Sequence, residues 1–167
     1  MDKSEYLVAR VGNIKLGAFC RDVENVYCGT YRLYRLFSQG GYFRGLTVLN
    51  KQVMQVLDLR RRIGMADREK ADKMTLITFN TGTETRLAVV VDEIIGMKTI
   101  TTDQIRKNDK TLGNRQQNID LLFPMIAVLN DGRHKSSNDD GLIHILDSTY
   151  LEKHEPIEED SGELEFF

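Results

Sequence analysis

Apolar and polar residues alternate along most of the chain, which is the pattern of half-buried β-strands. In residues 5–19, two such stretches flank Gly12-Asn13, a pair that tolerates the positive φ angles of a two-residue turn. This segment is therefore predicted to form a β-hairpin. Three more hairpins are predicted by the same pattern: 43–49 with 52–59 around a turn at Asn50-Lys51, 73–79 with 85–94, and 122–129 with 142–147 across the polar loop 130–141.

Helical signals are short. Val23 and Val26 have i, i+3 spacing, which predicts one or two helical turns in residues 20–26. Short helices or turns are also expected after Asp58, at Thr102-Asp103, and over residues 148–154, with Ser148 as the cap of the last. Because many short strands separated by turns favour closure of the sheet, the predicted fold is all-β, with small closed or nearly closed barrels.

Charge divides the chain near residue 155. Residues 155–167 (EPIEEDSGELEFF) contain six acidic residues and no basic one, so removing them changes the formal net charge from −2 to +4. We expect a folded domain over residues 1–154 and an acidic, disordered tail over 155–167. The tail ends in the apolar residues LEFF, so it is interpreted either as a frayed end or as a tethered docking peptide.

Composition excludes several classes of protein. The 167-residue chain has no apolar run approaching the roughly 20 residues of a membrane-spanning helix. Its N-terminus lacks the basic and apolar regions of a signal peptide, and Cys20 and Cys28 have no metal-ligand spacing. The net charge of −2 disfavours nucleic acid as a partner. A cytoplasmic protein with reduced thiols is expected.

No group of residues has the spacing of an active site. His134, His144 and His154 are each ten residues apart, unlike a helical zinc pair. The loop 130–141 contains Ser, His and Asp but is too flexible a sequence to hold a nucleophile in place. The basic cluster is interpreted as a solvated helix face rather than a phosphate site; it consists of Arg60, Arg61, Arg62, Arg68, Lys70 and Lys73. The sequence therefore predicts no enzyme activity, no cofactor and no metal.

Four segments, in order, resemble the CheW-like family, the coupling proteins of bacterial chemosensory arrays. They are YLVARVGNIKLGAFCRDVENV, YFRGLTVLNKQVMQVLDLRRRIG, RLAVVVDEIIGMKTITTDQIRK and GLIHILDSTYL, and they are distributed along residues 5–153 from one end to the other. The resemblance implies two intertwined five-stranded β-barrels with a shared core. It also implies a non-enzymatic adaptor that binds the regulatory domain of a CheA-type histidine kinase and the cytoplasmic tip of a chemoreceptor, at membrane-associated arrays but without membrane insertion.

The resemblance also suggests which residues contact partners. Val23, Arg44 and Asn50 are expected on the receptor-facing surface, with Gly45 shaping the turn and Lys51 supplying a nearby charge. The kinase-facing surface is left unassigned.

Other residues in the matching segments are expected to be structural. Val91 lies in a strand that is buried on both faces, and Asp92 ends that strand and accepts backbone N–H groups at the bend. Asp58 caps a turn, and Gly96, like Gly45, marks a bend or a close backbone approach.

The chain departs from the family pattern at three positions. Asn50 replaces an arginine that is linked to partner contact, Lys51 replaces a glycine, and Gln55 stands where proline is usual. An amide lacks the charge and rigid donor geometry of a guanidinium. Two alternatives therefore stay open: a CheW-like regulator that occupies one partner surface without bridging, and a small β-barrel enzyme or ligand-binding protein.

Overall fold

The computed structural model describes residues 2–34, 43–60, 63, 65, 73–80, 86–107, 122–129 and 141–153. Some of the predicted features lie outside the described residues. They are the tail 155–167, most of the loop 130–141, and two histidines, His134 and His154.

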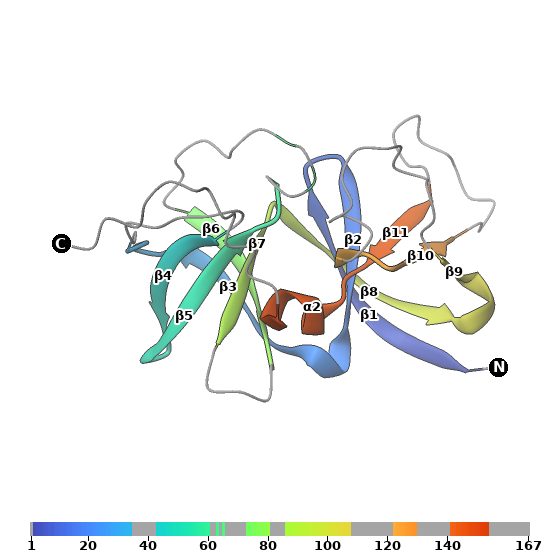
Figure 1. Ribbon diagram of the computed structural model, residues 1–167, viewed down its shortest axis with the longest axis horizontal. Helices are drawn as coiled ribbons and strands as arrows, with labels where there is room; N and C mark the ends of the chain where they lie inside the picture. Colours follow the sequence, from blue (N-terminus) through green and yellow to red (C-terminus); the bar gives the residue numbers. More distant parts are fainter. Residues whose placement is uncertain are drawn as a thin grey trace.

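The described residues form eleven strands in two sheets, with little helix (Figure 1). The six-stranded sheet has the order β8-β1-β2-β11-β10-β9 and the five-stranded sheet the order β3-β6-β7-β5-β4. The strands are β1 (Lys3–Val11), β2 (Ile14–Phe19), β3 (Val23–Thr30), β4 (Phe43–Leu49), β5 (Gln52–Asp58), β6 (Lys73–Phe79), β7 (Leu87–Val91), β8 (Glu93–Thr101), β9 (Ile105–Lys107), β10 (Met125–Val128) and β11 (Leu142–Ile145). The short helices are η1 (Cys20–Asp22), η2 (Thr102–Gln104) and α2 (Ser148–Lys153).

The all-β fold class and the four predicted hairpin pairings are confirmed. The strand pairs β1–β2, β4–β5, β6–β7 and β10–β11 are all antiparallel. The sheets are completed by two parallel pairs, β2 with β11 and β5 with β7, which join strands far apart in the sequence. Local alternation predicts hairpins, but it contains no information about these long-range pairs.

The predicted barrels differ in detail. One sheet has six strands rather than five, and within the described residues no strand pairing closes either sheet into a barrel. One isolated bridge brings the ends of the five-stranded sheet together: Tyr34, just after β3, exchanges backbone hydrogen bonds of 2.7 and 2.8 Å with Leu46 of β4. The sheet is therefore curled, and the segment that follows β3 is linked to β4 at one point.

The core lies on both faces of β7, whose five residues are all buried. Leu87, Val89 and Val91 belong to the largest core cluster, while Ala88 and Val90 belong to a second cluster on the other face. Leu151 of α2 is also buried in the largest cluster, and Figure 1 shows α2 between the two sheets. The unbroken run of valines at residues 89–91 led to the expectation of a strand that is buried on both faces, and β7 is such a strand.

Two local predictions are wrong. The helix expected in residues 20–26 covers only Cys20–Asp22, and Val23 already begins β3. Residues 23–30 form a strand because they pair along their length with β6. The i, i+3 spacing of Val23 and Val26 did not indicate this pairing. The strand expected over 85–94 is two strands, since β7 ends at Val91 in one sheet and β8 begins at Glu93 in the other.

At α2, Asp147 rather than Ser148 caps the first turn: its carboxylate accepts the Thr149 N–H at 3.0 Å.

Candidate partner-binding surface

The tip of the β4–β5 hairpin is a tight turn formed by Asn50 and Lys51. Both residues are exposed and have positive φ, +50° and +63°. A two-residue loop with positive φ at both positions has the type I′ geometry, which matches the twist of a hairpin. Asparagine tolerates this conformation, but lysine does so at a cost, because its Cβ crowds the backbone. The turn therefore presents an amide and an ammonium group to solvent.

Two valines form an exposed apolar pair beside this turn. Val48 and Val53 lie directly opposite each other in the register and are 53% and 59% exposed. Their neighbours Leu49 and Met54 point into the core and are buried. Residues 43–57 contain Arg44 and Lys51 but no acidic residue. The hairpin tip, residues 48–53, thus combines apolar surface with positive charge.

Gly45 sits at an irregularity in β4, where the register with β5 shifts between Phe43 and Gly45. Its φ is +142°, and a Cβ there would lie 2.5 Å from the Tyr34 carbonyl oxygen. Only glycine permits this approach, since that distance is below any normal contact. Gly45 therefore allows the Tyr34 segment to reach β4, and the half-buried Arg44 lies in the shifted stretch.

Val23 is separated from this hairpin. It begins β3, where it pairs with Phe79 of β6, and within the described residues no ladder joins β3 itself to β4. Its half-buried side chain packs against the largest core cluster. The structure therefore brings Arg44, Gly45, Asn50 and Lys51 together on one hairpin but does not place Val23 with them.

Glu24, next to Val23, forms an ion pair that sequence reasoning missed. Arg86, just before β7, donates through Nη1 to both Glu24 carboxylate oxygens at 2.6 and 2.7 Å. Both side chains are about one-third exposed, 36% for Arg86 and 37% for Glu24. The pair joins residues 62 positions apart, which no local pattern could have indicated.

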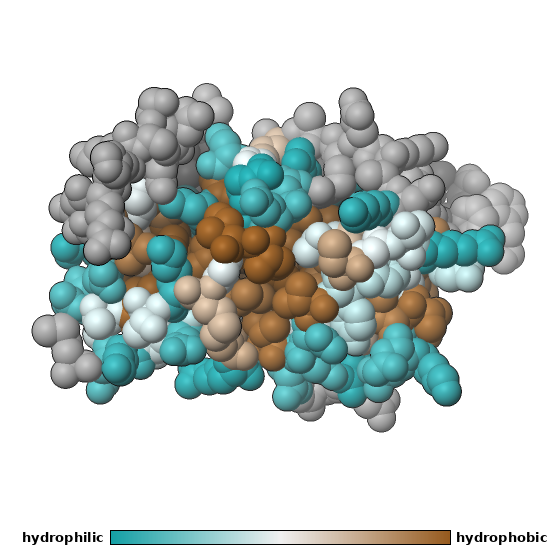
Figure 2. Space-filling model, turned by 180° about the vertical axis from the view of Figure 1, so that it is seen from behind, coloured by the Kyte–Doolittle hydropathy of each residue, from teal (hydrophilic) through white to brown (hydrophobic). Residues whose placement is uncertain are grey.

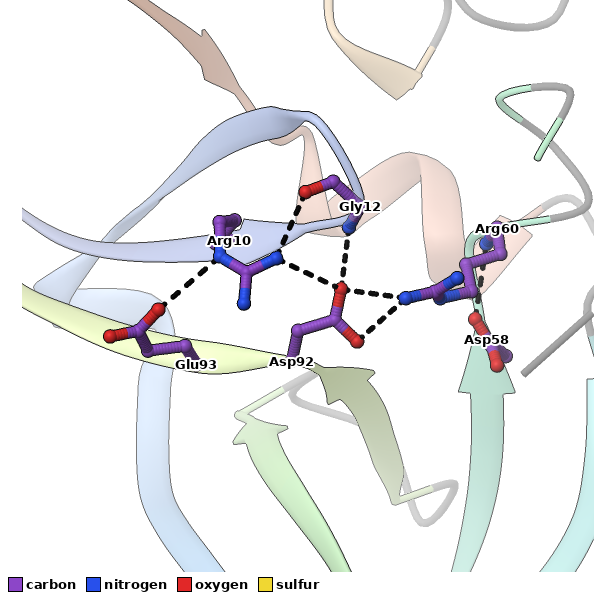
Figure 3. Close-up of polar contacts among 6 residues, drawn as sticks. All are labelled: Arg10, Gly12, Asp58, Arg60, Asp92 and Glu93. Carbon is purple, nitrogen blue, oxygen red and sulfur yellow. Dashed lines mark hydrogen bonds and ion pairs between the residues drawn. The ribbon is translucent and has the colours of Figure 1, made fainter. Parts of the chain in front are cut away.

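The junction between the two sheets is held by Asp92, the residue between β7 and β8 (Figure 3). One Arg60 Nη donates to both carboxylate oxygens, at 2.8 and 2.9 Å, and the Gly12 N–H donates to one of them at 2.5 Å. Arg10 approaches the same carboxylate at 3.7 Å, and the Asp92 side chain is only 9% exposed. Asp92 therefore joins the end of the five-stranded sheet to the β1–β2 turn of the other sheet.

Neighbouring residues fix the geometry of this junction. The Asp58 carboxylate accepts the Arg60 backbone N–H at 3.1 Å, which places Arg60 directly after β5. Arg10 donates to the Gly12 carbonyl at 3.0 Å and to Glu93 at 3.2 Å. Arg60 is therefore part of an ion-pair network and not of the solvated basic face expected from the sequence. The remaining arginines of that cluster, at positions 61, 62 and 68, lie outside the described residues.

A second exposed apolar pair lies on β8, at the edge of the six-stranded sheet. Ile95 and Met97 are 44% and 61% exposed, and the register with β1 is shifted next to Gly96. Gly96 has a φ of +148°, but a Cβ there would meet no atom within 4 Å. Gly96 therefore lies beside an irregularity of β8, with open space where a Cβ would stand.

Apolar surface also extends beyond these strands. Figure 2 shows apolar side chains gathered across the middle of the face seen from behind, with hydrophilic side chains above and below. The exposed large apolar residues of the described chain are Val26, Tyr34, Val48, Val53, Ile95, Met97 and Met125. A contiguous exposed apolar patch on a folded domain is typical of a protein-contact surface.

His144 and Cys20 are withdrawn from solvent, the first fully and the second in part. His144 of β11 is buried, with its ring edge-on to Phe123 at 5.7 Å between centroids. Burial raises the pKa of the Cys20 thiol, and the nearby Glu5 carboxylate raises it further. Within the described residues, no three His, Cys, Asp or Glu side chains are grouped to hold a metal ion. Nor does any helix of that part of the chain have the length and apolar content to span a membrane.

Comparisons with known proteins agree with this architecture. A family model described as the CheW-like domain matches residues 5–151. A solved structure, the scaffolding protein TtCheW from Thermoanaerobacter tengcongensis, superposes with a TM-score of 0.70 at 17% sequence identity. The alignment covers 92% of this chain and 95% of that protein, so the two share a fold over nearly their whole length.

Proposed function

Because the chain belongs to the CheW-like domain family, we propose that it is a non-enzymatic adaptor that couples chemoreceptors to a histidine kinase. The family match over residues 5–151 carries the proposal, since it includes both sheets and every candidate residue. An adaptor of this kind works by holding two partners in a fixed relative position, so that the state of one biases the state of the other.

We assign the receptor contact to the β4–β5 hairpin. Its tip offers an apolar pair, Val48 and Val53, beside the charge of Lys51 and the amide of Asn50. Apolar contacts supply affinity, and the surrounding polar groups supply register and specificity. Gly45 and Arg44 shape the same hairpin, whereas Val23 is packed against the core and serves the fold more directly than the contact.

The junction at Asp92 suits an adaptor. If each sheet carries one partner, the relative position of the partners depends on the rigidity of the connection between the sheets. The Arg60–Asp92–Gly12 contacts supply that connection through short hydrogen bonds to a carboxylate that is only 9% exposed. Charge-assisted bonds in a partly desolvated site are stronger and more directional than exposed ones.

The proposal is tested by binding the full chain to two purified proteins from the same genome: the regulatory domain of its CheA-type kinase and the cytoplasmic tip of a chemoreceptor. Surface plasmon resonance should show binding to each, and the adaptor should bring both into one complex. Val53→Ser combined with Lys51→Glu should weaken receptor binding about tenfold or more, because it removes apolar contact and reverses a charge. Lys98→Glu on β8 is the matched control. Absence of binding to both proteins would refute the adaptor role.

A second candidate is a regulator that occupies only one partner surface. Asn50 favours it, because this exposed position at the turn carries an amide where the family has an arginine. In that case Asn50→Arg should increase receptor affinity, since a guanidinium binds carboxylates with two donors. The two functions differ in the complex they form: the adaptor assembles all three proteins together, and the regulator blocks one of the two contacts.

A further inference from the structure

The acidic segment 155–167 is unexplained by the adaptor role. It carries six carboxylates and no positive charge, yet it contains four large apolar residues: Ile157, Leu164, Phe166 and Phe167. Acidic composition keeps such a segment soluble, whereas apolar side chains at intervals are typical of a peptide that docks on a protein surface. The body of the chain, residues 1–154, has a formal net charge of +4, opposite in sign to this segment.

Two described surfaces present a pair of exposed apolar side chains, and their charges differ. On β8, Ile95 and Met97 are accompanied by both Glu93 and Lys98. In the β4–β5 hairpin, Lys51 is exposed at the tip and Arg44 is half-buried farther along β4. Residues 43–57 contain no carboxylate, and Asp58, which ends β5, is buried. An acidic peptide is repelled by carboxylates at close range and attracted by cations. Charge complementarity therefore selects the β4–β5 hairpin over β8.

The acidic segment is long enough to reach this hairpin. It begins shortly after α2, whose Leu151 lies in the same core cluster as Leu57 of β5. Four residues of strand separate Leu57 from Val53, which corresponds to about 13 Å. Thirteen residues, extended, span about 40 Å. The segment can therefore pass along the five-stranded sheet and still place its final residues at the hairpin tip.

We propose that residues 155–167 dock on the hairpin tip of the same molecule. The carboxylates lie beside Lys51 and accept from the Asn50 amide, and the aromatic end covers Val48 and Val53. Because the tip is also the proposed receptor contact, a docked segment competes with the receptor and lowers its apparent affinity. That regulatory consequence rests on the proposed function, whereas the docking itself does not.

Docking is tested in the full chain by paramagnetic relaxation. A spin label is attached at Ser161→Cys in a background of Cys20→Ser and Cys28→Ser, and the broadening of backbone amide signals is measured. We expect the amides of residues 48–53 to broaden more than those of β8. Added salt, at roughly 0.5 M, should reduce the broadening by about half or more, because it screens the charges.

Substitutions separate the proposed contact from random collisions. Lys51→Glu with Val53→Ser should remove the excess broadening at the hairpin, and Lys98→Glu, a matched cation change on β8, should leave it unchanged. Equal broadening of the hairpin and β8 would overturn the proposal. A second control mixes isotope-labelled chains that carry no spin label with unlabelled chains that carry the spin label. Broadening at the hairpin in this mixture would also overturn the proposal, because the docked segment would then come from a second molecule. Receptor and kinase binding are measured separately, so failure of docking leaves the adaptor proposal standing.

Discussion

Replacing Asp92 by asparagine removes the negative charge at the junction between the sheets while preserving the size of the side chain. Arg60 then faces an amide in place of the carboxylate that it contacts at 2.8 and 2.9 Å. Hydrogen bonds to charged groups contribute about 1.5–3 kcal/mol, and breaking a buried ion pair costs about 3–5 kcal/mol. The Asp92 side chain is 9% exposed, but that of Arg60 is 22% exposed, so solvent recovers part of the loss. We expect Asp92→Asn to lower the free energy of unfolding by about 2–3 kcal/mol.

The assay is urea denaturation followed by far-UV circular dichroism, since the chain has no tryptophan. A double-mutant cycle with Arg60→Gln isolates the Arg60–Asp92 interaction, with an expected coupling energy of about 1.5–2 kcal/mol. Arg10→Gln is the control: Arg10 is 43% exposed and lies 3.7 Å from Asp92. Its coupling to Asp92 should be at most about 0.5 kcal/mol. Additive effects of Asp92→Asn and Arg60→Gln would refute the claim that this pair ties the sheets together.

Three further predictions concern strain and reactivity. Gly45→Ala and Gly96→Ala impose similar positive φ strain, at +142° and +148°, but only the first brings a Cβ to 2.5 Å from a backbone oxygen. In urea denaturation, Gly96→Ala should lower the free energy of unfolding by about 1–2 kcal/mol, and Gly45→Ala should lower it by about 2 kcal/mol more. Equal losses for the two variants would contradict the predicted clash at Gly45. Lys51 has a left-handed backbone conformation, which glycine adopts without strain, so Lys51→Gly should stabilise the protein by about 0.5–1 kcal/mol and raise its Tm by a few degrees. A lower Tm would contradict this prediction. Cys20 is half-buried and its thiol has a raised pKa, so iodoacetamide should alkylate it more slowly than the exposed Cys28. The rate of Cys20 alkylation should also continue to increase with pH above 9.0, the ordinary pKa of a thiol. Mass spectrometry of the modified peptides measures both rates, and faster modification of Cys20 would contradict the prediction.

Local alternation in the sequence was enough to predict the all-β class and the four hairpins. A hairpin needs only two amphipathic strands and a turn, and all three are contiguous in the chain. The Asn50-Lys51 turn was predictable for this reason, as was the burial of β7 on both faces from its run of valines. Resemblance to the CheW-like family identified the chain because its segments occur in the family's order, and the family match confirmed it.

Tertiary structure alone decided which strands are neighbours in each sheet and which residues meet. Val23 has the spacing of a helical residue, but pairing with β6 makes it the start of a strand that, within the described residues, forms no ladder with the hairpin. The contacts of Asp92 with Gly12 and Arg60 extend over 80 and 32 positions, and their partners come from different sheets. A sequence pattern records the preferences of neighbouring residues, whereas contacts over such separations exist only once the sheets have packed and excluded water.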